Sequence, residues 1–264
     1  MPRGAAVLLV AAMLIVHARA SAANPWLKEE GDAELIANLE ISKQPDGLGP
    51  GATAGASSAL HLEYGYDRRA TLIADIDAQR YSWDGPGQTR FNNARAGLRT
   101  AMARWDNSLL SVEAIAGAMA VRDGPLPNTT ISLYGTAEGR LMFGQGFDVL
   151  GRHAFSGIEA GWRWRPGPPA DEAVLDAILG IAPWPGGLAM LQSFSILGTG
   201  RAAGAYSRYS LSKLELSLAQ GITDTLSVQG GVLYQVAGRE AGSAGIVMAL
   251  WWRISTGQLS RSIF

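Results

Sequence analysis

Two pairs of neighbouring polar residues are the first places where this sequence could do chemistry. His61 and Glu63 lie two positions apart in a segment that alternates polar and apolar residues, so both lie on one face of a strand. A metal site there would need a third ligand, which the spacing does not identify, and a histidine bonded to interior neighbours is the simpler interpretation. His153 lies close to Ser156, but it is expected at a turn with no acidic partner, so a membrane-embedded Ser/His hydrolase is only a third hypothesis.

The other candidates are charged residues that alternate with apolar ones. Two interpretations stay open for them. In the first, the acids and bases, which are present in comparable numbers, pair across strands and fill the interior of a narrow closed sheet. Alternatively, they line a water-filled pore whose acidic early strands favour cations or polar neutral solutes. With His61, the lumen-lining candidates are Glu34, Glu40, Glu63, Asp75, Asp77, Arg95, Arg99, Glu113, Glu138, Arg140, Glu159, Arg163, Lys213, Glu215 and Arg253.

Composition narrows the possible functions. The chain of 264 residues has no cysteine, which excludes thiolate metal sites and cysteine nucleophiles. Its formal net charge of −1 gives no reason to expect a nucleic-acid partner. The sequence thus predicts no catalytic residue, no metal and no cofactor, and a protein that is not an enzyme.

Alternation with a period of two residues recurs along the chain and predicts the elements that position these side chains. From Asp32 to Ser42, the residues Ala33, Leu35, Ala37, Leu39 and Ile41 form one apolar face, as in a strand with two unlike sides. Further strands are expected at about Leu60 to Tyr66, Leu72 to Ala78, Asn93 to Trp105, Leu109 to Ala120, Thr130 to Phe143, Phe155 to Arg165, Glu172 to Ala182, Leu188 to Leu197, Leu214 to Leu218, Leu226 to Val236 and Gly245 to Ile254. The total is about 12 strands, with 10 to 14 possible.

The connections between these segments alternate in length. Short turns are expected around Arg68, Asn107, Phe147, Pro185 and Thr223, and longer or Gly/Pro-rich connections separate the remaining pairs. Outer-membrane barrels have short periplasmic turns and longer external loops, so this alternation of short and long connections favours an all-β, antiparallel transmembrane β-barrel. No segment after the N-terminal region has 18 uninterrupted apolar residues, which leaves a closed sheet as the way to span a bilayer.

A soluble β-sandwich in the periplasm would also alternate polar and apolar faces, and it is the main alternative fold. The aromatic residues argue against it, because they gather near the strand ends as in the interfacial girdles of membrane barrels. These residues are Tyr64, Tyr66, Trp105, Trp162, Trp164, Trp251 and Trp252.

The N-terminus indicates export. Arg3 precedes an apolar run from Ala5 to Val16 and a stretch of small residues that ends at Ala22, which predicts a signal peptide at residues 1–22 and a barrel domain at residues 23–264. A retained anchor is the alternative, but the run of about a dozen apolar residues is shorter than the ~20 that a spanning helix needs.

Several segments resemble known outer-membrane proteins. They are Gly139–Gly144, Arg165–Glu172, Leu191–Phe194, Lys213–Ser217, Ala237–Arg239 and Leu250–Arg253. Together they are similar to proteobacterial barrels related to the transporter-like family named for the meta pathway of phenol degradation. The resemblance implies an outer-membrane location in a Gram-negative bacterium and uptake of small compounds, aromatic ones among them. The tail from Ile254 to Phe264 departs from that family's usual ending at the last strand.

Three functional hypotheses follow from the barrel and the resemblance. The first is a porin-like passive channel or transporter for small molecules, with the lipid bilayer and a small-molecule solute as partners. The second is a non-conducting structural or binding barrel, filled by its own side chains. The third is the membrane-embedded hydrolase.

Overall fold

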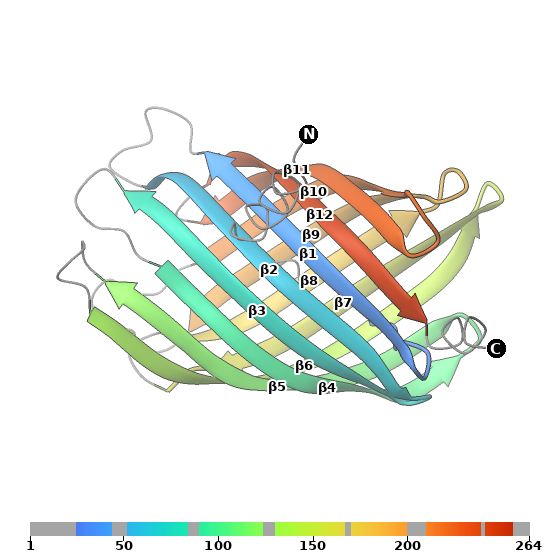
Figure 1. The fold of residues 1–264 in the computed structure, drawn as a ribbon, viewed down its shortest axis with the longest axis horizontal. Coiled ribbons are helices and arrows are strands. Elements are labelled where there is room, and N and C mark those ends of the chain that lie inside the picture. The colour runs from blue at the N-terminus through green and yellow to red at the C-terminus, as the bar shows by residue number, and fades with distance from the viewer. Residues whose placement is uncertain are drawn as a thin grey trace, which may run out of the picture.

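Twelve antiparallel strands form one closed barrel in the computed structural model, which describes residues 25–43, 52–83, 90–123, 130–166, 170–199, 210–238 and 241–255. Each strand pairs with its neighbours in the sequence, and β1 pairs with β12 (Figure 1). The all-β fold and the strand number predicted from the alternation are therefore confirmed. The strands are β1 (Asp32–Lys43), β2 (Ala52–Asp67), β3 (Ala70–Trp83), β4 (Arg90–Trp105), β5 (Ser108–Asp123), β6 (Thr130–Val149), β7 (Arg152–Trp164), β8 (Asp171–Ile181), β9 (Gly187–Thr199), β10 (Ser210–Gly221), β11 (Leu226–Gly238) and β12 (Ala244–Ser255).

The ring closes through a continuous ladder between the first and last strands. Its register runs from Asp32 opposite Ser255 to Lys43 opposite Ala244 without a shift. Closure leaves no strand edge with unpaired backbone groups, which would cost several kcal/mol each in hydrocarbon.

The connections sort to the two ends of the barrel by length, as the sequence predicts. The strand ends that short turns join, the start of β1 and the end of β12 lie at one end of the barrel, and the strand ends that longer connections join lie at the other (Figure 1). By the rule for outer-membrane barrels, the short-turn end is periplasmic and the other end is extracellular.

One predicted turn is misplaced. Phe147 lies within β6, opposite Ala154 of β7, and the chain reverses further on at Leu150 and Gly151. Both of these residues have positive φ, 50° and 72°, which matches the backbone of a two-residue hairpin turn. Gly144 and Gly146 belong to β6 as well, opposite Gly157 and Phe155 of β7.

The two faces of the wall differ in chemistry. Outward residues are large and apolar, among them Ile76, Leu216 and Val232, which are 57 to 59% exposed. Inward residues include many buried charged groups. A sheet with its apolar face outside and its polar face enclosed is suited to lipid rather than to water.

The aromatic residues follow this pattern with one exception. Trp162, Trp164 and Trp252 are about half exposed on the outer face near strand ends. Trp251 instead lies inside, where its Nε1 donates a 2.8 Å hydrogen bond to Oε1 of Gln229, so its assignment to a girdle was wrong. None of the described residues forms a helix long and apolar enough to cross a membrane. The predicted signal peptide, residues 1–22, lies outside the described residues.

Candidate functional site: the barrel interior

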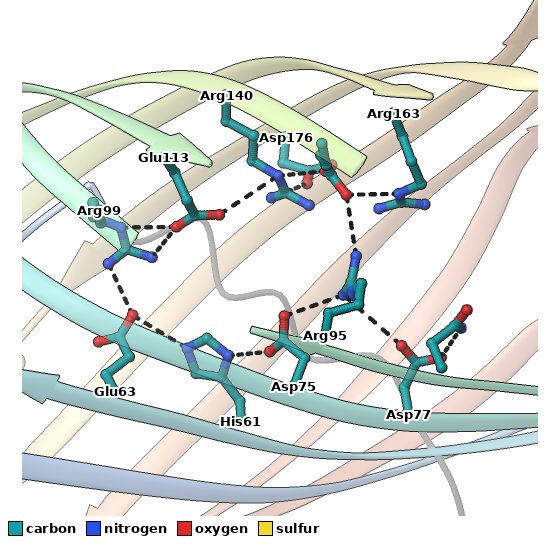
Figure 2. A network of polar contacts seen from close by, with 12 residues as sticks. His61, Glu63, Asp75, Asp77, Arg95, Arg99, Glu113, Arg140, Arg163 and Asp176 are labelled. Carbon is teal, nitrogen blue, oxygen red and sulfur yellow. Dashed lines mark hydrogen bonds and ion pairs between the residues drawn. The ribbon is translucent and has the colours of Figure 1, made fainter. Parts of the chain in front are cut away.

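The barrel interior contains the charged residues singled out from the sequence. Each lumen-lining candidate lies on the inward face of its strand, and most are less than a tenth exposed. Arg253 differs, because its side chain is 60% exposed at the periplasmic mouth, 3.8 Å from Glu34. The structure brings most of the others together into one network of ion pairs, called here the charge network (Figure 2).

Arg99 on β4 is a centre of the charge network on its periplasmic side. Its Nη1 donates to Oε1 of Glu63 at 2.8 Å, and its Nη2 donates to Oε2 of Glu113 at 2.7 Å. Glu113 lies on the adjacent strand β5, but Glu63 lies on β2, with β3 between them. The pair Arg99–Glu63 therefore connects two strands that share no backbone ladder.

Arg140 on β6 is a second centre and is enclosed by acids. It donates to Glu138 and to Glu159 at 2.6 Å each, and Asp176 on β8 lies 3.6 Å away. One guanidinium thus serves three carboxylates that would otherwise repel one another. A second oxygen of Glu159, Oε1, has no hydrogen-bond partner among the described residues.

His61 on β2 is held between two carboxylates, as Figure 2 shows. Its Nδ1 lies 2.6 Å from Asp75, and its Nε2 lies 3.1 Å from Glu63. Arg95 on β4 completes the group by contacting Asp75 at 3.2 Å and Glu138 at 3.1 Å. Both ring nitrogens are occupied, so the histidine acts as a link in the charge network. No three acidic or histidine side chains in the described ranges are arranged to hold a metal.

Asp77, Glu40 and Lys213 lie nearer the extracellular end. Asp77 accepts a 2.6 Å hydrogen bond from the amide of Asn93 and lies 3.8 Å from Arg95. Lys213 on β10 reaches Glu40 on β1 at 2.5 Å. Because β11 and β12 separate these two strands, this pair also crosses part of the lumen.

Arg165 and Glu172 belong to the charge network but were not among the predicted site residues. Glu172 accepts from Arg163 at 2.5 Å and lies 2.6 Å from Arg165, which also donates to the backbone oxygen of Ala170. A signal was present, because Glu172 has the same parity in β8 as Asp176. The strand predicted from Glu172 to Ala182 already included Glu172, so parity alone could have placed it in the interior.

The interior of β9 to β12 is mostly uncharged. Glu215 on β10 accepts hydrogen bonds from the amides of Gln192 and Gln229 at 3.1 and 3.0 Å. Below it, a small apolar cluster lies at the periplasmic end. The cluster consists of Ile178, Met190 and Ala219, with Phe155, Leu188 and Trp251 packed against them.

The chain before β1 also lies inside the barrel. Residues 25–31, called here the inner segment, are bound through their backbone by side chains of three strands. Thr71 on β3 accepts from the amide of Lys28 at 2.9 Å, Arg99 donates to the oxygen of Trp26 at 3.0 Å, and Ser111 on β5 donates to the oxygen of Pro25 at 2.9 Å. The inner segment therefore passes along the wall from β2 to β6 near the periplasmic mouth.

Two glycines make room for the inner segment. A Cβ on Gly65 would lie 1.8 Å from the backbone oxygen of Glu29, and a Cβ on Gly144 would lie 2.3 Å from Cγ of Pro25. The amide of Gly31 also donates to the oxygen of Gly65 at 2.8 Å. Any side chain at either position would collide with the inner segment, so these glycines are part of its binding site.

Lys28 is the only cation of the described inner segment and is held by two acids of the wall. Its ammonium contacts Glu34 and lies 3.2 Å from Glu63. Burial lowers the pKa of Lys28, but the attraction of Glu63 and Glu34 outweighs burial and raises the pKa above its ordinary value. Lys28 is therefore charged at neutral pH.

His153 has an acidic partner, which sequence spacing did not identify. Its Nδ1 lies 2.8 Å from Asp148 across the Leu150–Gly151 turn. The imidazole is 93% exposed at the periplasmic end.

The comparisons with known proteins agree with this architecture. Neither a protein-family model nor a curated protein matches the chain by sequence. Among solved structures, the translocator domain of autotransporter NalP from Neisseria meningitidis aligns over 96% of this chain and 95% of its own, with a TM-score of 0.56 and 10% identity. The NanC porin aligns over 83% of this chain and 100% of its own, with a TM-score of 0.52 and 8% identity. The chain thus has the fold of an outer-membrane β-barrel.

Proposed function

We propose that the protein is a closed outer-membrane barrel that does not conduct in its resting conformation and has a structural or binding role. The observation that carries this proposal is the occupied interior. Arg99, Arg140 and Arg163 are 3 to 6% exposed and each is paired with acids. In an open pore, water would hydrate such groups, whereas here protein partners satisfy them.

The inner segment supports the same proposal. It occupies the periplasmic side of the lumen, and glycines and hydrogen-bonding side chains of the wall fit it closely. In this proposal the barrel has no catalytic role: both ring nitrogens of His61 contact carboxylates, and His153 is paired with Asp148 at an exposed turn.

Conductance across planar bilayers tests the proposal. Refolded protein lacking residues 1–22 is expected to produce no current steps across the bilayer. A variant that also lacks residues 23–31 is expected to produce brief or small current steps. Discrete steps from the protein with an intact inner segment would overturn the closed barrel. A heat-modifiability gel on both proteins confirms that each is folded before the presence or absence of conductance is interpreted.

Passage of small apolar molecules is a second candidate function, which the inner apolar cluster favours. Phe155 and Trp251 are partly buried and pack against the buried Met190, on strands that the inner segment does not contact. The resemblance to transporter-like proteins of the phenol meta pathway suggests aromatic compounds as cargo. Binding of phenol or toluene should quench tryptophan fluorescence in the wild type and less in a Trp251→Leu variant. Equal quenching in both proteins would exclude this site.

A further inference from the structure

Three buried amide side chains of the lumen each have one polar atom without a hydrogen-bond partner among the described residues. They are Asn38 on β1, Gln192 on β9 and Gln235 on β11, and each is 4 to 7% exposed. The atoms concerned are Oδ1 of Asn38, Oε1 of Gln192 and Nε2 of Gln235. Buried polar atoms of proteins are almost always hydrogen-bonded, so these three atoms can bind a polar molecule that enters the lumen.

The strand register groups the two glutamines around β10. Gln235 is the partner of Lys213 across the ladder between β10 and β11, and Gln192 is the partner of Glu215 across the ladder between β9 and β10. The amide of Gln192 also donates to Glu215 at 3.1 Å. Both glutamines therefore flank the same short stretch of β10 on its inward face.

Asn38 reaches the same part of the lumen from the other side. It shares the inward face of β1 with Glu40, which lies two residues nearer the extracellular end. Lys213 donates to Glu40 across the width of β11 and β12. Asn38 thus lies on the periplasmic side of the ion pair that connects β1 to β10. The three amides are called here the amide site.

The side chains of Lys213 and Glu40 are the parts of this region that can move most easily. They are 16% and 14% exposed, more than the amides beside them. On the strands between them, Gly231 shares a ladder row with Glu40 through Val247, and Gly245 lies at the next inward position. Because no glycine side chain fills the space that the ion pair crosses, rotation of two long side chains opens the amide site without breaking a backbone ladder.

The unpartnered atoms define the chemistry of a ligand. Asn38 and Gln192 offer acceptors, whereas Gln235 offers a donor. A hydroxyl group both donates and accepts, so a compact molecule with several hydroxyl groups can satisfy all three atoms. The amides are neutral and Lys213 is already paired with Glu40, which favours an uncharged ligand.

We propose that the amide site binds a neutral ring compound with several hydroxyl groups, such as a monosaccharide or a cyclic polyol. Its hydroxyl groups donate to Asn38 and Gln192 and accept from Gln235, and the pair Lys213–Glu40 closes over it. Phe194, at the next inward position beyond Gln192, offers apolar surface to the C–H groups of the ring. This proposal rests on the binding role proposed above, because the amide site belongs to a closed lumen.

Ligand-observed NMR titration of the refolded protein lacking residues 1–22 tests the proposal, in a detergent without a sugar headgroup. Glucose and inositol are expected to bind saturably, with a Kd on the order of 1 mM for molecules of this size. Cyclohexanol, a ring with a single hydroxyl group, is expected to bind at least about tenfold more weakly, because it leaves amide atoms unpaired.

Variants locate the binding. Gln192→Leu and Gln235→Leu are each expected to weaken glucose binding about fivefold, the usual effect of one lost hydrogen bond. Thr136→Val is the matched control, because Thr136 is also buried with an unpartnered oxygen among the described residues but lies on β6, in the opposite half of the barrel. It is expected to bind glucose as the wild type does. A heat-modifiability gel confirms that each variant is folded.

Three results would overturn the proposal. They are no glucose binding up to about 100 mM, which would mean that ordered water alone satisfies the amides, equal affinity for cyclohexanol and glucose, and an effect of Thr136→Val as large as that of Gln235→Leu. The conductance measurement keeps this outcome separate from the proposed function. A barrel that produces no current steps and binds no glucose overturns the amide site alone, whereas current steps from the protein with an intact inner segment overturn the closed barrel.

Discussion

The two halves of the barrel wall are built in opposite ways. Strands β2 to β6 are 14 to 20 residues long and hold many of the buried ion pairs and the inner segment on their inner face. Outside, alanine and glycine alternate with larger apolar residues. Strands β9 to β12 are 12 or 13 residues long, with amides and apolar residues inside and bulky aliphatic residues outside.

The difference shows where each half gets its rigidity. In β2 to β6, Arg95 and Arg99 tie strands that are not neighbours, which backbone ladders cannot do. In β9 to β12, the ladders are supplemented by short links such as Gln229 to Glu215. The first half should therefore be sensitive to loss of single charges, and the second half should tolerate loss of single polar groups.

The largest expected effect tests that contrast directly. Arg99→Leu should lower the free energy of unfolding by about 3–5 kcal/mol, because it leaves Glu63 and Glu113 buried without their main cation. Gln229→Leu in the other half should cost about 1–3 kcal/mol. Urea unfolding in lipid vesicles, followed by tryptophan fluorescence, measures both. Equal costs would show that the two halves are held alike.

The next effect concerns the fit of the inner segment. Gly65→Val should displace it at a cost of about 1–3 kcal/mol, because the added Cβ would overlap the oxygen of Glu29. Maleimide labelling of a single Leu27→Cys reporter, in a chain that otherwise has no cysteine, reports the displacement. Gly139→Val on the open outer face is the matched control and should leave the labelling rate unchanged. Slow labelling in both variants would contradict the described position of the inner segment against Gly65.

Loss of one hydrogen bond to the inner segment should have a smaller effect. Ser111→Ala removes the donor to the oxygen of Pro25 and should cost about 1 kcal/mol, or roughly a fivefold faster labelling of the same reporter. Ser217→Ala, a buried serine in the other half, should leave the labelling rate at the wild-type value. A response to Ser217→Ala equal to that of Ser111→Ala would remove the distinction between the halves.

The smallest expected effect is a dependence on pH. Because the pKa of Lys28 is raised on folding, its contribution is complete below the unfolded pKa and is lost as pH rises through the higher folded value. Exposure of the inner segment should thus stay constant from neutral pH to about pH 10 and increase above it. Hydrogen exchange measured by mass spectrometry follows this change, and Lys28→Met should remove the upper step. A step near pH 6 to 7 would point to another group.

The fold could be predicted because the membrane imposes a strict period of two. Lipid contacts one face of every strand, so each outward position from Leu72 to Ile76 must be apolar or small. The same parity would have placed Trp251 correctly, since it shares a face with Val247 and Ala249, both buried. Two adjacent tryptophans cannot both face lipid in a regular strand.

The inner segment could not be predicted because its stability comes from distant residues. Residues 25–31 show no alternation, and their partners Thr71, Arg99 and Ser111 are 43 to 86 positions away. The role of Gly144 was equally hidden, because a glycine that leaves space for another segment looks the same in the sequence as one that permits a turn. Which charges pair also depends on the strand register, which alternation alone does not determine.

The ladder between β1 and β12 has a consequence for biogenesis. β1 can close the ring only by pairing with β12, so one edge of β1, twelve residues long, stays unpaired until the last strand has been made. Until then, the unpaired backbone N–H and C=O groups of that edge are open to pairing with a strand of another polypeptide. A chain that stops short of Ala244 would lack β12 and could not close the ring through the ladder with β1.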